Sequence, residues 1–158
     1  MGQRGDRLAV AAQVSDDLAA MEASLVALGD RSEGLAAELF DGFIAAHPHY
    51  APAFINPEAA CERMTRETLE ALLGLAGGEW WVRPTVTNFV DLHRNYAAFT
   101  AHDYAAWFEL TIAAMEHRAG QDWPGEASAA WRGQAAAMVY LIASELAQDW
   151  SHQIVAAG

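Results

Sequence analysis

The sequence is poor in cysteine and in basic residues. Cys61 is the only cysteine, which excludes an internal disulfide and any metal site built from several cysteines, so we interpret it as a small helix residue. The chain of 158 residues carries nine Lys and Arg residues against 21 Asp and Glu residues, for a formal net charge of −12. A chain this acidic repels phosphate backbones, and we predict that it binds no nucleic acid.

Membrane-spanning stretches, strand patterns and nucleotide-binding loops are missing as well. The apolar runs are too short for a membrane span, and the first residues, MGQRGDRLAV, lack the basic start and apolar stretch of a secretory signal. We therefore expect a cytoplasmic protein with no membrane partner. The stretch GLAGGEW lacks the lysine of a P-loop. Because alanine is abundant and β-branched runs bounded by turns are scarce, we predict an all-α fold.

Capping signals divide the chain into helices. Ser15 precedes two acidic residues, which indicates a helix start, and Gly29 indicates its end. Asn56 caps a helix that has proline in its first turn, and Thr100 with Asp103 resembles a capping box. We interpret residues 15–155 as one domain and residues 1–14 as an N-terminal extension. The expected helices cover about 15–28, 32–46, 57–76, 85–94, 100–118 and 126–154, with a short helical turn at 47–54 and a loop at 77–84.

One helical stripe ends on an imidazole. In the stretch VTNFVDLHRNY, Val86, Phe89 and Val90 are spaced to line one side of a helix, and the next position on that side is His93. Two interpretations fit this residue: a buried neutral histidine bonded to a backbone carbonyl, or the single protein ligand of a haem iron. One histidine is too few for a closed zinc site. We expect the remaining histidines to be solvent-exposed in loops or near helix ends: His47, His49, His102, His117 and His152.

Three segments, in this order, are similar to segments of the globin family. FDGFIAAHPHYAPAF resembles the second globin helix followed by a His-Pro corner and the phenylalanine that wedges the haem, here Phe54. LHRNYAAFTAHDYAAWF resembles the segment that carries the iron-binding histidine in bacterial single-domain globins and flavohaemoglobins, here His93 followed by Tyr104. EASAAWRGQAAAMVYLI resembles the last globin helix, with Trp131 near its start. The resemblance extends over nearly the whole chain.

The resemblance implies a globin fold, in which helices A, B, C, E, F, G and H surround a haem pocket and helix D is absent. It implies haem b as the cofactor and His93 as the proximal iron ligand, with its second ring nitrogen donating to a carbonyl or carboxylate. Tyr104 would stand behind this histidine, and Glu145 lies near the position of the usual partner of that tyrosine. The residues expected around the haem are Phe40, Phe43, Phe54, Met64, Thr68, Leu72, Phe89, Leu92, His93, Phe99, Tyr104, Phe108 and Met138.

The distal side departs from the bacterial pattern. Phe40 and Met64 stand where bacterial globins of this type usually have a tyrosine and a glutamine, and neither can donate a hydrogen bond. Thr68, one helical turn after Met64, is the nearest candidate donor. We hypothesise that oxygen dissociates quickly from such a site or that the haem oxidises easily, whereas CO and NO still bind well. Met64 offers a further option because a thioether can coordinate haem iron, although we favour an apolar wall residue.

We therefore expect a globin that binds a diatomic gas (O2, NO or CO) reversibly. Nitric oxide dioxygenase or peroxidase activity would need an external reductant, so a separate reductase is the expected partner in that case. Two alternatives stay open: a haem-free globin-like module for interaction or sensing, and a redox haem protein of His–Met or peroxidase type. A homodimer formed through the last two helices is suggested by family analogy alone.

Overall fold

Every regular element of the described chain is helical, which confirms the all-α prediction. The computed structural model describes the backbone of residues 2–156 and the side chains of residues 5–7, 9–10 and 16–148. Short 3-10 helices connect some of the longer ones: η1 (Gly29–Ser32), η2 (Pro48–Ala53) and η3 (Gly120–Asp122). The α-helices are α1 (Gly2–Leu28), α2 (Leu35–Ala46), α3 (Pro57–Ala76), α4 (Val82–Arg94), α5 (Ala101–Ala119) and α6 (Ala127–Ala156).

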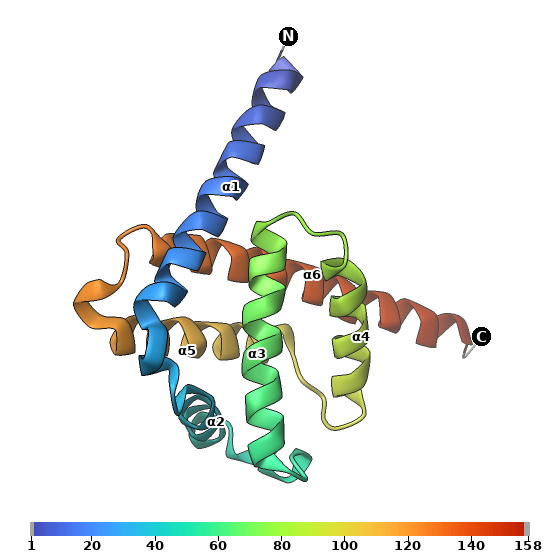
Figure 1. The fold of residues 1–158 in the computed structure, drawn as a ribbon. Coiled ribbons are helices and arrows are strands. Elements are labelled where there is room, and N and C mark those ends of the chain that lie inside the picture. Colours follow the sequence, from blue (N-terminus) through green and yellow to red (C-terminus); the bar gives the residue numbers. More distant parts are fainter. Residues whose placement is uncertain (1, 157–158) are drawn as a thin grey trace.

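The helices pack in crossing directions around a shared core (Figure 1). Helices α5 and α6 lie along each other, and α3 and α4 stand side by side across them. Helix α2 packs against α3 and α5, while the second half of α1 packs against α3 and α6. The first turns of α1 extend away from the other helices. Within the described residues, no helix combines the length and the apolar character needed to cross a bilayer.

Local hydrogen bonds fix the helix starts that the sequence indicated. The Asn56 side chain accepts a bond from the backbone nitrogen of Ala59 at 3.3 Å, ahead of α3. The capping box at α5 is complete, because the Thr100 hydroxyl accepts from the Asp103 nitrogen at 3.2 Å and the Asp103 carboxylate accepts from the Thr100 nitrogen at 2.8 Å. Both caps satisfy backbone donors that have no partner inside the helix.

Three expected helix starts were wrong. Helix α2 begins at Leu35 rather than Ser32, which ends the 3-10 helix η1. Helix α1 begins at Gly2, so Ser15 lies inside it and residues 2–14 continue the same helix. Ser and Asp are only mildly unfavourable inside a helix, by less than about 1 kcal/mol each, so the apparent capping signal does not interrupt it. Helix α4 begins at Val82 rather than Thr85 and includes Pro84, which had been expected to end the preceding loop. Proline is tolerated in the first helical turn, where its missing N–H has no partner in any case.

Two close packings hold the scaffold around the pocket. Trp131 on α6 is fully buried, and its indole nitrogen donates to the Ser24 hydroxyl on α1 at 2.8 Å. Where α3 approaches the start of α4, a Cβ atom on Gly74 would lie 2.5 Å from the Trp81 ring. Only glycine permits this approach, so Gly74 sets the spacing between α3 and α4.

Candidate functional site: an apolar pocket with one histidine

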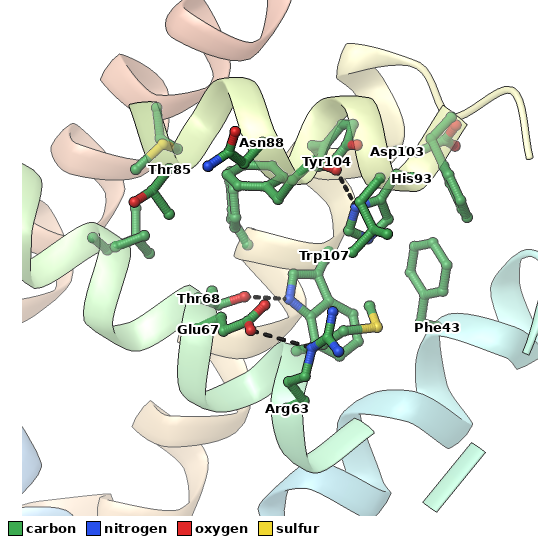
Figure 2. A pocket seen from close by; sticks show the side chains of 18 of the residues that line it. Phe43, Arg63, Glu67, Thr68, Thr85, Asn88, His93, Asp103, Tyr104 and Trp107 are labelled. Carbon is green, nitrogen blue, oxygen red and sulfur yellow. Dashed lines mark hydrogen bonds and ion pairs between the residues drawn. The ribbon is translucent and has the colours of Figure 1, made fainter. Parts of the chain in front are cut away.

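A cavity of about 260 Å³ lies between α3 and α4 and is completed by residues of α2, α5 and α6 (Figure 2). This volume is slightly below the range of about 300–1,000 Å³ that is typical of small-molecule sites. Arg63 and Glu67 form an ion pair with 3.2 Å between Nε and Oε1, and both side chains are about half exposed. They therefore mark the mouth, through which one edge of a flat ligand can reach solvent.

The structure brings the expected haem-contacting residues together, with one exception. Phe40 does not line the cavity; it is half-buried, and its ring packs edge-to-face on Phe54 at a centroid distance of 4.9 Å. The residues of the expected set that do line the cavity are Phe43, Phe54, Met64, Thr68, Leu72, Phe89, Leu92, His93, Phe99, Tyr104, Phe108 and Met138.

Further lining residues were missed by the sequence reasoning. Ala71, Thr85, Asn88 and Trp107 each lie three or four residues from an expected lining residue on the same helix, so helical spacing alone would have found them. Asp103 had no such signal, since its capping role explained it fully. The complete set of missed lining residues is Arg63, Glu67, Ala71, Thr85, Asn88, Asp103 and Trp107.

The His93 imidazole is held in one tautomer at the end of α4. Its Nδ1 lies 2.6 Å from the carbonyl oxygen of Phe89, and because a carbonyl only accepts, Nδ1 carries the proton. Burial lowers the pKa of His93 below its usual range, so the ring is neutral at neutral pH. Nε2, on the far side of the ring, therefore presents a lone pair, and no hydrogen bond from the described residues reaches it. The expected bond from one ring nitrogen to a carbonyl is present.

Three aromatic rings enclose His93. Phe99, Tyr104 and Phe89 stand edge-on to the imidazole at centroid distances of 5.6, 5.7 and 6.0 Å. Burial raises the pKa of the Tyr104 hydroxyl above its usual range, so this phenol stays protonated. Glu145 reaches this region through its backbone carbonyl, which accepts from Arg94 at 3.3 Å. Among the described residues, no hydrogen bond joins the Glu145 carboxylate to Tyr104.

A buried carboxylate anchors the start of α5 beside the pocket. Asp103 is 8% exposed, and besides its capping bonds it accepts from the Tyr50 hydroxyl at 2.6 Å. Burial raises the pKa of Asp103, but hydrogen bonds from Thr100 and Tyr50 outweigh it, and the net shift is downward. Burial and the hydrogen bond to Asp103 together raise the pKa of the Tyr50 hydroxyl to about 12. Asp103 is therefore a fixed negative charge at neutral pH.

One histidine near this carboxylate was expected to be exposed and is not. The side chain of His47 is 21% exposed, its Nε2 lies 3.8 Å from Asp103, and its ring stacks on Phe43 at 4.6 Å. The reason is the turn at Pro48, which folds η2 back against the end of α2. His49, His102 and His117 are exposed as expected, and the side chain of His152 lies outside the described residues.

The opposite wall, on α3, combines apolar side chains with Thr68 and, at the mouth, the Arg63–Glu67 pair. Met64 and Leu72 face the cavity, together with Thr68 between them. The indole nitrogen of Trp107, on α5, donates to the Thr68 hydroxyl oxygen at 2.9 Å (Figure 2). Thr68 is therefore the polar side chain of the α3 wall that is bonded to another helix.

A second cavity, of about 450 Å³, lies behind His93. His93, Phe99 and Tyr104 line both cavities, so these rings form the partition between them. The remaining walls of the rear cavity come from the end of α4, the segment leading to α5, and Leu146 on α6. His93 can therefore be approached from two sides, and only the front side has the extended apolar lining.

Comparisons with protein-family models, with curated proteins and with solved structures found no match to this chain. Within the described residues, no group of three or more His, Cys, Asp or Glu side chains is placed to hold a metal ion. The geometry of the pocket is therefore the basis on which a function is assigned.

Proposed function

We propose that this chain is a haem-binding protein of the globin type that binds a diatomic gas reversibly, with His93 as the proximal ligand of haem b. The observation that carries the proposal is the state of His93: a neutral imidazole with its Nδ1–H fixed on a backbone carbonyl and its Nε2 lone pair unused, at the wall of an apolar cavity. Neutral imidazole of this kind is the usual protein ligand of haem iron.

The residues present fit that cofactor. Aromatic and aliphatic side chains on α3 and α4 form two facing walls, which suit a flat apolar ring. At the mouth, the Arg63 guanidinium is placed to neutralise carboxylates on the exposed edge of such a ring. Haem held by a single histidine supplies an open coordination position at which O2, NO or CO binds reversibly.

The protein contributes orientation and exclusion of water. The bond to the Phe89 carbonyl fixes the rotation of the His93 ring and raises the basicity of Nε2. The rings of Phe89, Phe99 and Tyr104 prevent the imidazole from tilting. On the other wall, Met64 and Leu72 keep water from the ligand side.

Met64 supports a second candidate function, because its thioether lines the same cavity as His93. If the sulfur coordinated the iron opposite His93, the protein would transfer electrons and would not bind gas. A Met64→Leu substitution separates the two functions. In the gas-binding protein it leaves the spectra nearly unchanged, whereas in a His–Met protein it removes the sulfur ligand and converts the iron from six- to five-coordinate.

A haemin titration of the full chain tests the proposal. We expect uptake of one haemin per chain, a Soret band, and quenching of the fluorescence of Trp107, which lines the pocket. His93→Ala should lose the normal reduced spectrum and regain it on addition of free imidazole, which fills the space of the lost ring. The matched control is His117→Ala, which removes an exposed histidine of α5 and should bind haemin as the unmodified chain does.

Two results would contradict the proposal. A chain that takes up no haemin would favour the haem-free interaction module. A His93→Ala variant with the same spectra as the unmodified chain would show that haem binds elsewhere.

A further inference from the structure

The cavity behind His93 has walls of its own. Its volume of about 450 Å³ lies within the range of about 300–1,000 Å³ that is typical of small-molecule sites. Short side chains leave this space open and larger apolar ones line it, and the residues concerned are Ala97, Ala98, Ala101, Val90 and Leu146. None of these residues lines the front cavity. The rear cavity is therefore a separate compartment on the other side of the partition formed by His93, Phe99 and Tyr104.

The charged side chain and the threonine hydroxyl on this rear wall already have partners. The Arg94 guanidinium donates to the Asp91 carboxylate at 2.7 Å and to the Glu145 carbonyl at 3.3 Å. The Thr100 hydroxyl donates to the Asp103 carboxylate at 3.0 Å and accepts from the Asp103 nitrogen at 3.2 Å. An anion in the rear cavity would face the negative charges of Asp91 and Asp103 as well as the positive charge of Arg94, so electrostatics favour a neutral ligand.

The Tyr104 phenol is the polar group that the rear cavity offers to a ligand. Among the described residues, no hydrogen bond reaches its hydroxyl. In Figure 2, Tyr104 lies next to His93 and on the other side of the pocket from Arg63. Burial raises the pKa of Tyr104, and the charge of Arg94 lowers this pKa more than the charge of Asp103 raises it. Because Arg94 lines the rear cavity and not the front one, the hydroxyl lies on the rear side, where it can donate a hydrogen bond.

We propose that the rear cavity is a second ligand site, which takes a small neutral molecule with an apolar body and one accepting oxygen, such as a cyclic ketone. The ketone oxygen accepts from the Tyr104 hydroxyl, and the ring of the ligand packs on Val90, Phe99 and Leu146. Apolar walls around one polar group that fixes orientation are usual for small-molecule sites. The site does not rest on the proposed gas-binding function. If the front pocket holds haem, the rear ligand contacts the proposed iron ligand from the side opposite to the gas.

An NMR titration of the full chain with cyclohexanone tests the site. We expect the backbone amide signals of Ala97, Ala98 and Ala101 to shift, with a Kd of about 1 mM for so small a molecule. Tyr104→Phe removes the hydroxyl alone and should weaken binding about fivefold. Tyr96→Phe is the matched control, because Tyr96 is exposed and lines neither cavity, and it should leave the Kd unchanged.

Two further measurements distinguish the rear cavity from the front one. Ala97→Leu places a larger side chain in the rear cavity and should abolish the binding of cyclohexanone, and an unchanged circular dichroism spectrum shows that this variant is folded. When haemin fills the front pocket, cyclohexanone should still bind with a Kd within about threefold of that of the haem-free chain.

The outcomes separate this site from the proposed function. Equal affinities of Tyr104→Phe and the unmodified chain, or undiminished binding to folded Ala97→Leu, would overturn the rear site. Displacement of cyclohexanone by haemin would place the ketone in the front pocket and overturn it as well. A chain that takes up no haemin contradicts the gas-binding function, and the Tyr104→Phe and Ala97→Leu titrations then decide the rear site alone.

Discussion

The two facing walls of the pocket differ in the partners that hold their polar side chains. On the His93 side, Nδ1 of the imidazole, the Asp103 carboxylate and the Tyr50 hydroxyl all have partners at 2.6 Å. On the α3 side, Arg63 and Glu67 pair with each other at the mouth, and the Thr68 hydroxyl oxygen accepts from Trp107. The bonds at Nδ1 of His93 and at Asp103 hold these two side chains in one geometry, which suits a residue that is to hold a cofactor. Among the described residues, the α3 wall carries no comparable bond to a backbone carbonyl or a buried carboxylate.

Among the substitutions considered, removal of the Asp103 side chain should lower the free energy of unfolding the most. Asp103→Ala removes the acceptor of the Tyr50 hydroxyl and of the Thr100 backbone nitrogen, and with it one of the two bonds of the capping box of α5. We expect a loss of about 3 kcal/mol in the free energy of unfolding, measured with urea. Asp41→Ala, at an exposed position of α2, is the control and should change stability by less than about 0.5 kcal/mol. An equally small change for Asp103→Ala would show that the hydrogen bonds of the Asp103 carboxylate do not stabilise the fold.

A methyl group on Gly74 should force the two walls apart. Its Cβ would lie 2.5 Å from the Trp81 ring and 3.0 Å from Val82, at the junction of α3 and α4. We expect Gly74→Ala to destabilise the chain by about 2 kcal/mol and to weaken haemin binding. Gly133→Ala is the matched control of opposite sign, because nothing lies within 4 Å of the added carbon inside α6. It should stabilise the chain by about 0.5–1 kcal/mol, so equal effects of the two substitutions would refute the role of Gly74.

The His93 wall should respond to pH before any haem is added. The folded-state pKa of His93 is lowered by burial, so below the unfolded-state value of about 6.5 the unfolded chain binds the proton more readily. Stability should therefore fall as the pH drops below that value, with a slope from this group of at most about 1.4 kcal/mol per pH unit, until the folded-state pKa is passed. Urea unfolding of the chain and of His93→Phe across this range measures the difference. An unchanged slope in His93→Phe would mean that His93 is not the titrating group.

Asp103 titrates in a separate, more acidic window with the same sign, so stability again falls as the pH falls. The folded-state pKa of Asp103 is lowered. Its contribution to the free energy of unfolding is therefore complete above the unfolded-state pKa of about 3.9 and is lost as the pH falls through the folded-state pKa. The contributions of His93 and Asp103, which lie on the same wall, can thus be distinguished by acid titration.

The smallest effect is expected on the α3 wall. Met64→Leu exchanges two side chains of similar volume, and we expect less than about 1 kcal/mol of change in stability and nearly unchanged gas-bound spectra. Calorimetry and absorption spectra check both. A large spectral change would show that the Met64 sulfur is bound to the metal and that this wall is not apolar in function.

Local signals in the sequence predicted much of the scaffold. The caps at Asn56 and Thr100 were found because their partners lie within three residues along the chain. The predicted helix start at Ser15 was wrong because serine and aspartate are also tolerated inside a long helix. No local pattern indicates that residues 2–14 belong to the same helix.

The pocket was predictable to the extent that it follows helical spacing. His93 could be singled out because an apolar stripe ends on it, and the structure places it on the cavity wall. The bonds of Asp103 to Tyr50 and of Trp107 to Thr68 span 53 and 39 residues along the chain, so no periodicity of a single helix reveals them. These long-range contacts hold Asp103 and Thr68 in place beside the pocket.

The central claim is most directly tested by the absorption spectrum of the protein purified with its natural cofactor, recorded as isolated, reduced, and reduced with CO. We predict an intense Soret band that shifts cleanly on addition of CO. A colourless protein that takes up no added haemin would contradict it, and the stripe that ends on His93 would then be a core whose histidine is satisfied by the Phe89 carbonyl alone.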